Sequence, residues 1–161
     1  MKFELINIKK PQKDINVIIG TSHFIKSVED IYEALITAMP HIAFAVAFCE
    51  ASSDRLVRYE GTDKELIKYA IENAVSIGAG HTFIILLKDA YPINVLSRLR
   101  DVPEILSIYS ATSNDLQVLI VESEQGRGLA GVIDGEPPAG IEKESDKKKR
   151  KKFLRDIGYK F

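Results

Sequence analysis

Apolar residues recur at helical spacing in two stretches of the chain, and a proline marks the start of a third helix. Over residues 27–39 they lie three or four positions apart, which predicts a helix that Pro40 ends. The same spacing over residues 66–77 predicts a second helix, followed by Gly78, the residue type that most often terminates a helix. A third, shorter helix is expected to begin near Pro92, because proline suits the first helical turn.

Two of these helices are preceded by residues that typically satisfy the free N–H groups of a first turn. Ser27 is expected to cap the first helix, with Asp30 three positions further on. Thr62 and Glu65 have the same spacing before the second helix and predict a second capping box.

Strand-like apolar runs lie between and after these helices. The segment Val17-Ile18-Ile19 is apolar without alternation, which indicates a strand buried on both faces. The resulting order, β-β-α-β-β-α-β-α-β-β-β, predicts a single α+β domain with a mixed β-sheet and about three helices, rather than a doubly wound parallel sheet. The strands are expected at residues 2–8, 15–20, 42–49, 56–59, 82–87, 105–109, 116–121 and 129–133.

Charge divides the chain into a body and a tail. Residues 142–161 hold nine Lys and Arg against four Asp and Glu, a balance of +5, whereas residues 1–141 have a balance of −6. We therefore expect a domain over 1–141 and a charged C-terminal tail over 142–161. The tail is either a solvated tether or an exposed helix, and the apolar residues from Phe153 to Phe161 predict that its end docks on the body.

Composition narrows the class of protein. The single cysteine, Cys49, excludes an internal disulfide framework and a cysteine-built zinc site. No apolar run approaches the 18 to 20 or so residues that span a bilayer, and the N-terminus has no signal-peptide pattern, so a cytoplasmic location without membrane association is expected. The acidic body makes a nucleic-acid surface unlikely, and the alternative of RNA binding depends on the basic tail alone.

Two histidines occur in loops at the ends of predicted strands. His81 follows Gly78-Ala79-Gly80, where two glycines would let a ligand approach the backbone, and His23 follows hydroxyl residues in Gly20-Thr21-Ser22. From these residues alone, an ordinary loop histidine is favoured at both positions over a ligand site.

A third segment resembles a dinucleotide fingerprint in spacing only. Gly126, Gly128 and Gly131 match G-x-G-x-x-G, but the residues that follow predict a strand and a turn, whereas the fingerprint requires a helix. What remains is Arg127 between glycines in a hairpin, where a guanidinium and backbone N–H groups suit a phosphate. The simpler alternative is an exposed arginine beside a hairpin turn.

Isolated polar residues also lie near predicted strand ends. Glu50 follows Cys49, Asp89 follows the strand at 82–87, and Asn94 lies in the first turn of the third helix, where N–H groups favour anions. Each alone is usually a cap or a surface group. The residues by themselves therefore support only an α+β domain with an anion site rich in glycine and histidine.

Five ordered blocks, together with the C-terminal residues 153–160, resemble the adenosine-specific kinase family. The blocks are Gly20-Thr21-Ser22-His23-Phe24-Ile25-Lys26-Ser27-Val28-Glu29-Asp30, Ala47-Phe48-Cys49-Glu50-Ala51-Ser52, Ile77-Gly78-Ala79-Gly80-His81-Thr82-Phe83, Tyr91-Pro92-Ile93-Asn94-Val95-Leu96, and Glu124-Gln125-Gly126-Arg127-Gly128 with Val132-Ile133-Asp134-Gly135. The chain departs from the family pattern at Gly61-Thr62-Asp63 and at Ala111-Thr112-Ser113-Asn114-Asp115, so its ligand preference could differ there.

This resemblance implies a function and a set of site residues. Family members are described as binding adenosine and AMP, as carrying a stable phosphohistidine, and as forming trimers. It implies His81 as the phosphorylated residue, with His23 as the second choice, and Glu50 or Asp89 as the group that orients the imidazole or accepts a proton. The residues expected to bind nucleotide or phosphate are Gly78, Gly80, Asn94, Gln125, Gly126, Arg127 and Gly128.

The cofactor and the reaction stay open at this point. No resident metal site or cofactor is expected, although Mg²⁺ could accompany a nucleotide, and no phosphate loop with a lysine identifies a phosphoryl donor. The alternative to phosphoryl transfer is a sensor that binds adenosine nucleotides without turnover.

Overall fold

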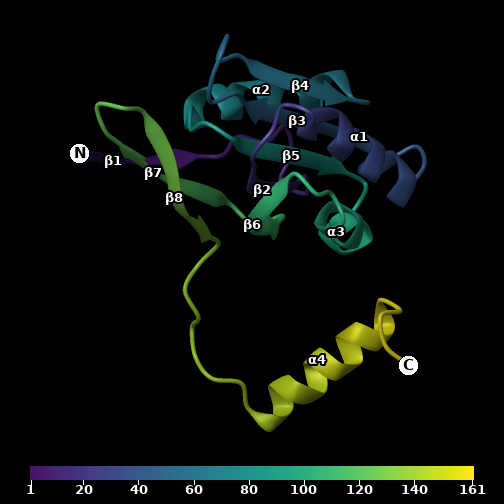
Figure 1. Ribbon diagram of the computed structural model, residues 1–161. Helices are drawn as coiled ribbons and strands as arrows, with labels where there is room; N and C mark the ends of the chain where they lie inside the picture. The colour runs from purple at the N-terminus through teal and green to yellow at the C-terminus, as the bar shows by residue number, and fades with distance from the viewer.

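The computed structural model describes residues 1–161 and contains eight strands and four helices (Figure 1). The strands are β1 (Lys2–Asn7), β2 (Asn16–Ser22), β3 (Ala43–Cys49), β4 (Val57–Gly61), β5 (Thr82–Lys88), β6 (Ile105–Thr112), β7 (Leu116–Glu122) and β8 (Arg127–Asp134). The helices are α1 (Ser27–Ala38), α2 (Lys64–Ile77), α3 (Pro92–Arg100) and α4 (Glu144–Asp156). The α+β class and the three helices of the body are confirmed.

The strands form two sheets, and every pairing is antiparallel. Five strands lie in the order β4-β3-β5-β2-β6, and three form a small sheet in the order β1-β7-β8. Within the predicted α+β class, the strands thus form two antiparallel sheets where the sequence predicts a mixed one. The reason is topological: each helix of the body connects two strands of the same direction, but an antiparallel strand lies between them, as β5 does between β2 and β3.

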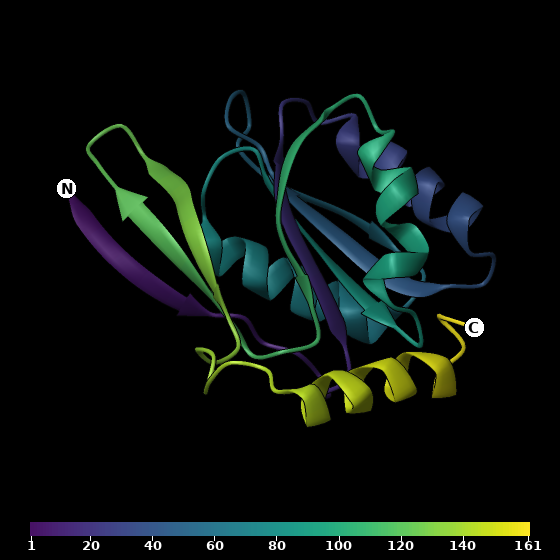
Figure 2. The ribbon, with the colours of Figure 1, turned by 90° about the horizontal axis from the view of Figure 1, so that it is seen from below.

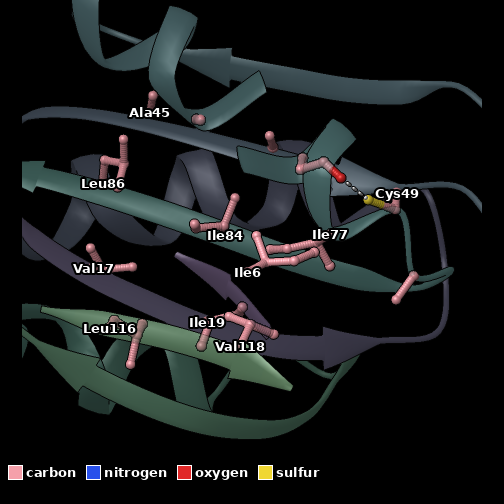
Figure 3. Packing of buried hydrophobic residues seen from close by; sticks show 14 of the residues in the cluster. Ile6, Val17, Ile19, Ala45, Cys49, Ile77, Ile84, Leu86, Leu116 and Val118 are labelled. Atoms are coloured by element: carbon pink, nitrogen blue, oxygen red, sulfur yellow. Dashed lines mark hydrogen bonds between the residues drawn. The ribbon is translucent and has the colours of Figure 1, made fainter. Parts of the chain in front are cut away.

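The five-stranded sheet is buried on both faces because its side chains alternate between two cores. Ile18 packs with Phe44 and Phe83 under α1 and α3, whereas the neighbouring Val17 and Ile19 pack on the opposite side. On that side α2 and the inner face of the small sheet cover the larger sheet; Figure 3 shows Ile6, Leu116 and Val118 of the small sheet meeting Ile19 and Ile84. The apolar run in β2 thus has the two-sided burial that its sequence predicts.

The starts of the first two helices differ from the predicted capping boxes. Ser27 is the first residue of α1, and its hydroxyl donates to the carbonyl of Phe24 instead of capping the helix. At α2 the cap is Asp63, whose carboxylate accepts from the N–H groups of Glu65 and Leu66. A carboxylate at this position also interacts favourably with the helix dipole. Gly78 ends α2 in the left-handed conformation, with φ of 55°.

The C-terminal segment forms a helix that stands apart from the body in Figure 1; Figure 2 shows the same helix, in yellow, from below. No residue of α4 is buried, and every hydrogen bond and ion pair of residues 142–161 is made within that segment. Phe153, Tyr159 and Phe161 are exposed, so the expected docking of this end onto its own body is not observed. No helix has both the length and the apolar character needed to cross a membrane.

Candidate functional site

Three of the sequence blocks meet at one edge of the five-stranded sheet. There β2 and β3 end and β5 begins, because β5 is antiparallel to both. The N–H of Ser22 donates to the carbonyl of His81 over 2.9 Å, and the N–H of His81 donates to the carbonyl of Cys49 over 2.7 Å. The backbone of His81 is therefore hydrogen-bonded to both β2 and β3. Its partner in β2, Ser22, directly precedes His23.

His81 has a backbone conformation that is unusual for a residue at the start of a strand. Its φ is 64°, in the left-handed region that few non-glycine residues adopt. The imidazole stacks on Phe48, with ring centroids 6.0 Å apart and an interplanar angle of 19°. Since Phe48 belongs to the core under α1 and α3, the imidazole of His81, which is partly exposed, is fixed on that side of the sheet.

His23 is a second imidazole at the same edge, and it is exposed. The backbone N–H of His23 donates to the carbonyl of Glu104 over 3.2 Å, and its ring stacks beside Phe24, with ring centroids 6.4 Å apart. Glu104 also pairs with Lys26 over 3.1 Å. Next to the two histidines, the hydroxyls of Ser22 and Thr82 and one carboxylate oxygen of Glu104 are buried without a hydrogen-bond partner in the protein. Buried polar atoms are usually paired, so this edge is unusually rich in unused donors and acceptors.

An open groove of about 990 Å³ lies at this edge, on the opposite side of the sheet from the His81 imidazole, between the end of α2, the β3–β4 loop and the β7–β8 hairpin. Neither His81 nor His23 lines the groove, but Gly80, the residue directly before His81, does. A Cβ on Gly80 would lie 2.8 Å from that of Ala51, so a larger residue would disturb the wall. Among the residues predicted from the sequence, the groove is lined by Glu50, Gly78, Gly80, Gln125, Gly126, Arg127 and Gly128.

Glu50 lies at the groove, but its carboxylate is already bound. One oxygen accepts from the N–H of Leu56 over 2.8 Å and the other from Arg58 over 3.0 Å. The Leu56 N–H and the Arg58 guanidinium hold the pKa of Glu50 below its usual value. A carboxylate stabilised in this way is a weaker base, and its contacts close the β3–β4 connection, so Glu50 serves the local structure.

Arg127 has a similar structural role in the groove wall. Its guanidinium donates to the carbonyls of Ile77 and Ser76 at the end of α2, over 3.0 and 3.2 Å, and so satisfies free carbonyls of the last turn. It also pairs with Glu122 at 3.0 Å and with Glu4 at 2.9 Å. Two carboxylates thus already neutralise the cation that the sequence suggested for a phosphate.

Arg55 is the groove cation that the sequence interpretation missed. It lines the same groove, is exposed, and makes no ion pair. Its φ of 54°, beside Ser53 at 59°, marks a tightly shaped loop between β3 and β4. The only signal in the sequence was the Ser52-Ser53-Asp54 turn, which does not reveal that Arg55 rather than Arg127 has a free guanidinium.

Two predicted residues lie at the opposite end of the sheet. His81 precedes β5 and Asp89 follows it, so a strand of seven residues, roughly 20 Å long, separates them. Asp89 therefore does not orient His81. Asn94, further along the chain, accepts from the N–H of Tyr91 at the start of α3 and does not line the groove.

The titratable side chains form no metal centre. No group of three or more His, Cys, Asp or Glu residues comes together in a way that could hold an ion. Cys49 is buried, and burial raises the pKa of its thiol to about 11, so it is a poor nucleophile.

The geometry defines an α+β protein with two antiparallel sheets and two histidines at a sheet edge, beside an open groove. The chain belongs to the adenosine specific kinase family, whose family model matches residues 6–160. The crystal structure of the PH1918 protein from Pyrococcus horikoshii OT3 is similar throughout, with a TM-score of 0.95 and 46% sequence identity over 99% of this chain and 98% of that chain. No curated protein matches the chain.

Proposed function

We propose that the protein binds adenosine or AMP in the groove beside the histidine edge and transfers a phosphoryl group through His81. Family membership supports the adenosine ligand. The observation that carries the choice of His81 is its placement. Hydrogen bonds from two strands fix its backbone, the Phe48 ring fixes the plane of the imidazole, and unpaired buried hydroxyls lie beside it. A rigid, partly exposed imidazole is suited to nucleophilic attack.

In the proposed reaction, the unprotonated nitrogen of His81 attacks the terminal phosphorus of a nucleoside triphosphate. The N–P bond forms as the P–O bond of the anhydride breaks, and the leaving diphosphate oxygen takes the electron pair of that bond. A hydroxyl of adenosine then attacks the phosphorus, and the N–P electron pair returns to the imidazole. His23 accepts the hydroxyl proton, because Glu50 has both carboxylate oxygens engaged.

The test is the intact mass of the purified protein before and after incubation with a nucleoside triphosphate, and again after mild acid. A phosphohistidine adds an acid-labile phosphate mass, and adenosine should remove it. His81→Ala should abolish both the mass increase and the transfer. His81→Gln should behave in the same way while keeping the fold, because an amide nitrogen is not a nucleophile at neutral pH.

His23→Ala is the matched control for the neighbouring imidazole. It should leave phosphate incorporation in place, since the nucleophile is intact, and slow the removal of the phosphate by adenosine, since the proton acceptor is lost. Loss of the phosphate in His23→Ala, with persistence in His81→Ala, would assign the chemistry to His23. Phosphate in both variants would exclude a phosphohistidine at this edge.

A second candidate function is binding of adenosine nucleotides without turnover. One observation favours it: both histidines lie outside the groove lining, and the two groove residues suited to catalysis, Glu50 and Arg127, are engaged within the protein. Calorimetric binding of adenosine together with the absence of any phosphate mass would support this alternative over transfer.

A further inference from the structure

The helix α4 carries more charge than any other element of the chain. Seven of its 13 residues are Lys or Arg and three are Asp or Glu, whereas residues 1–141 have a balance of −6. Six of the seven cations are consecutive, at residues 147–152. Whether such a run binds a partner depends on how many of its charges are already neutralised and on where they lie around the helix.

Only three of the cations are paired with carboxylates, and these belong to the same segment. The pairs are Lys147 with Glu144, Arg150 with Glu142, and Lys152 with Asp156. The other four make no ion pair: Lys148, Lys149, Lys151 and Arg155. The acidic body neutralises none of them, because the helix stands apart from it (Figure 1).

The unpaired cations form a stripe along one side of α4. Lys148, Lys151 and Arg155 are spaced three and four positions apart, so they share a face of the helix over roughly 10 Å, and all three are exposed. By the same periodicity the apolar Phe153 and Ile157 lie on the opposite side. The stripe is therefore open to solvent whatever covers the apolar end.

The cations of residues 147–152 also surround the helix. Six consecutive residues cover more than one full turn, so positive charge faces every direction in this stretch. The major groove of B-DNA is about 12 Å wide, close to the diameter of a helix with its side chains, and phosphates line it on both sides. A helix with cations all round can contact both phosphate rows at once, whereas a single strand offers only one.

Repulsion within α4 favours the same kind of partner. Lys148 and Lys152, like Lys151 and Arg155, lie four positions apart, where like charges destabilise a helix. An isolated helix of 13 residues is only marginally stable in water. Phosphates along its sides would remove the repulsion, so binding of a polyanion also stabilises the helix.

An anionic membrane is the competing polyanionic surface, and it fits less well. A helix that lies in a membrane interface needs an apolar face along its length. Residues 144–152 contain no apolar residue, and the apolar side chains of α4 begin only at Phe153, in its last turn. Most of the helix could not insert between lipid headgroups.

We propose that α4 binds double-stranded DNA in the major groove, through the phosphates and without sequence preference. The stripe of Lys148, Lys151 and Arg155 contacts one phosphate row, and Lys149, about a third of a turn around the helix, faces the other. The helix has no Asn or Gln to read adenine, and its lysines act as point charges. This function is separate from the proposed adenosine site, because no residue of α4 lines the groove of the body.

The test is the fluorescence anisotropy of a labelled DNA duplex of mixed sequence, titrated with the full-length protein. The wild type should bind, with a slope of log K against log salt of about −3 to −4, since four free cations each displace a counterion. The triple variant Lys148→Gln, Lys151→Gln, Arg155→Gln should bind at least about tenfold more weakly at about 50 mM salt and reduce this slope by about 2 to 3. Glutamine keeps a high helix propensity, so the helix should persist.

A matched variant on the body removes the same amount of charge. Lys2, Lys13 and Lys64 are exposed and make no ion pair, so Lys2→Gln, Lys13→Gln, Lys64→Gln should bind the duplex as the wild type does. Far-UV circular dichroism confirms that both triple variants are folded. Equal losses in the two variants would show that net charge alone matters and would overturn the proposal.

Two further titrations test the geometry of the contact. Single-stranded DNA should bind more weakly because it has one phosphate row, and duplex RNA should bind more weakly because its major groove is too narrow for a helix. Absence of duplex binding, or affinity unchanged in the α4 variant, would overturn the proposal. Binding to phosphatidylserine vesicles without binding to the duplex would overturn it and assign α4 to a membrane surface.

Discussion

Arg127 and Arg55 line the same groove, but their guanidinium groups differ in what they contact. Arg127 donates to two carbonyls of α2 and to two carboxylates, whereas Arg55 makes no ion pair. The residue type is identical, and only the neighbours decide which side chain can bind an anion. At the scale of the residue, the contacts that a side chain already makes within the protein therefore decide whether it can bind a ligand.

For a nucleotide in this groove, Arg55 is the phosphate ligand that we expect. Arg55→Ala should weaken AMP binding about tenfold, equivalent to about 1.4 kcal/mol, and leave adenosine affinity unchanged. Isothermal titration calorimetry with both ligands measures this. An equal loss for adenosine and AMP would show that Arg55 shapes the loop and does not contact the phosphate.

Arg127→Lys should act on stability and not on phosphate selectivity. A lysine cannot satisfy the Ile77 and Ser76 carbonyls and both carboxylates from one planar group, so the free energy of unfolding should fall by about 1–2 kcal/mol. Urea unfolding measures the loss. A selective loss of AMP affinity at unchanged stability would restore Arg127 as the phosphate ligand.

Glu50 predicts a pH dependence of stability. Its pKa is lowered in the folded protein, so its contribution is present above the unfolded value of about 4.3 and is lost as pH falls through the lower folded value. In thermal unfolding from neutral to acidic pH, Glu50→Gln should be less stable than the wild type at pH 7, and the two should converge in acid. A constant difference across this range would contradict the role given to Glu50.

The elements of the body follow from local patterns, but their arrangement does not. Spacing of apolar residues located α1 and α2, Pro92 located the start of α3, and the unbroken apolar run predicted the double burial of β2. The insertion of β5 between β2 and β3 depends on contacts between residues far apart in the sequence, and no local pattern encodes it.

The same limit applies to the candidate site. The glycine and histidine loops were recognisable because each follows or precedes an apolar strand. That Glu50 would be occupied by Leu56 and Arg58, or that Arg127 would bind the end of α2, fifty positions earlier in the chain, could not be read from local composition. Side-chain partners are set by the fold, so the sequence located the loops but not the availability of their charges.

Close packing within the large sheet makes one glycine irreplaceable. A Cβ on Gly20 would lie 2.3 Å from the Ser107 carbonyl oxygen and 2.6 Å from the Phe83 ring. Gly20→Ala should lower the free energy of unfolding by about 3 kcal/mol in urea denaturation, through overpacking. Gly131→Ala, in β8 with open space around its Cβ, should change stability by less than about 0.5 kcal/mol. Similar values for the two variants would contradict the packing around β2.

The whole molecule consists of a body with two cores and a C-terminal arm, residues 136–161, outside both of them. The site lies entirely in the body, and no hydrogen bond joins the arm to it. The family model nevertheless extends over the arm, to residue 160. The arm is thus a regular part of the chain that its own core does not require.

Truncation after Ile141 should leave the body folded and keep adenosine affinity within about tenfold, about 1.4 kcal/mol, of the full chain. Circular dichroism and titration calorimetry on the shortened chain measure the two quantities. A larger loss of affinity would show that an arm, from the same or a neighbouring copy, reaches the groove.

The isolation of α4 has a further consequence for the spectroscopy of the protein. No side chain of α4 is buried against the body, so this helix has no share in the cooperative unfolding of the two cores. Ellipticity at 222 nm should therefore fall gradually on mild heating, before the cooperative transition of the body, and truncation after Ile141 should remove this early phase. Temperature would then set whether the basic stretch at 147–152 is a rigid rod of charge or a flexible polycation.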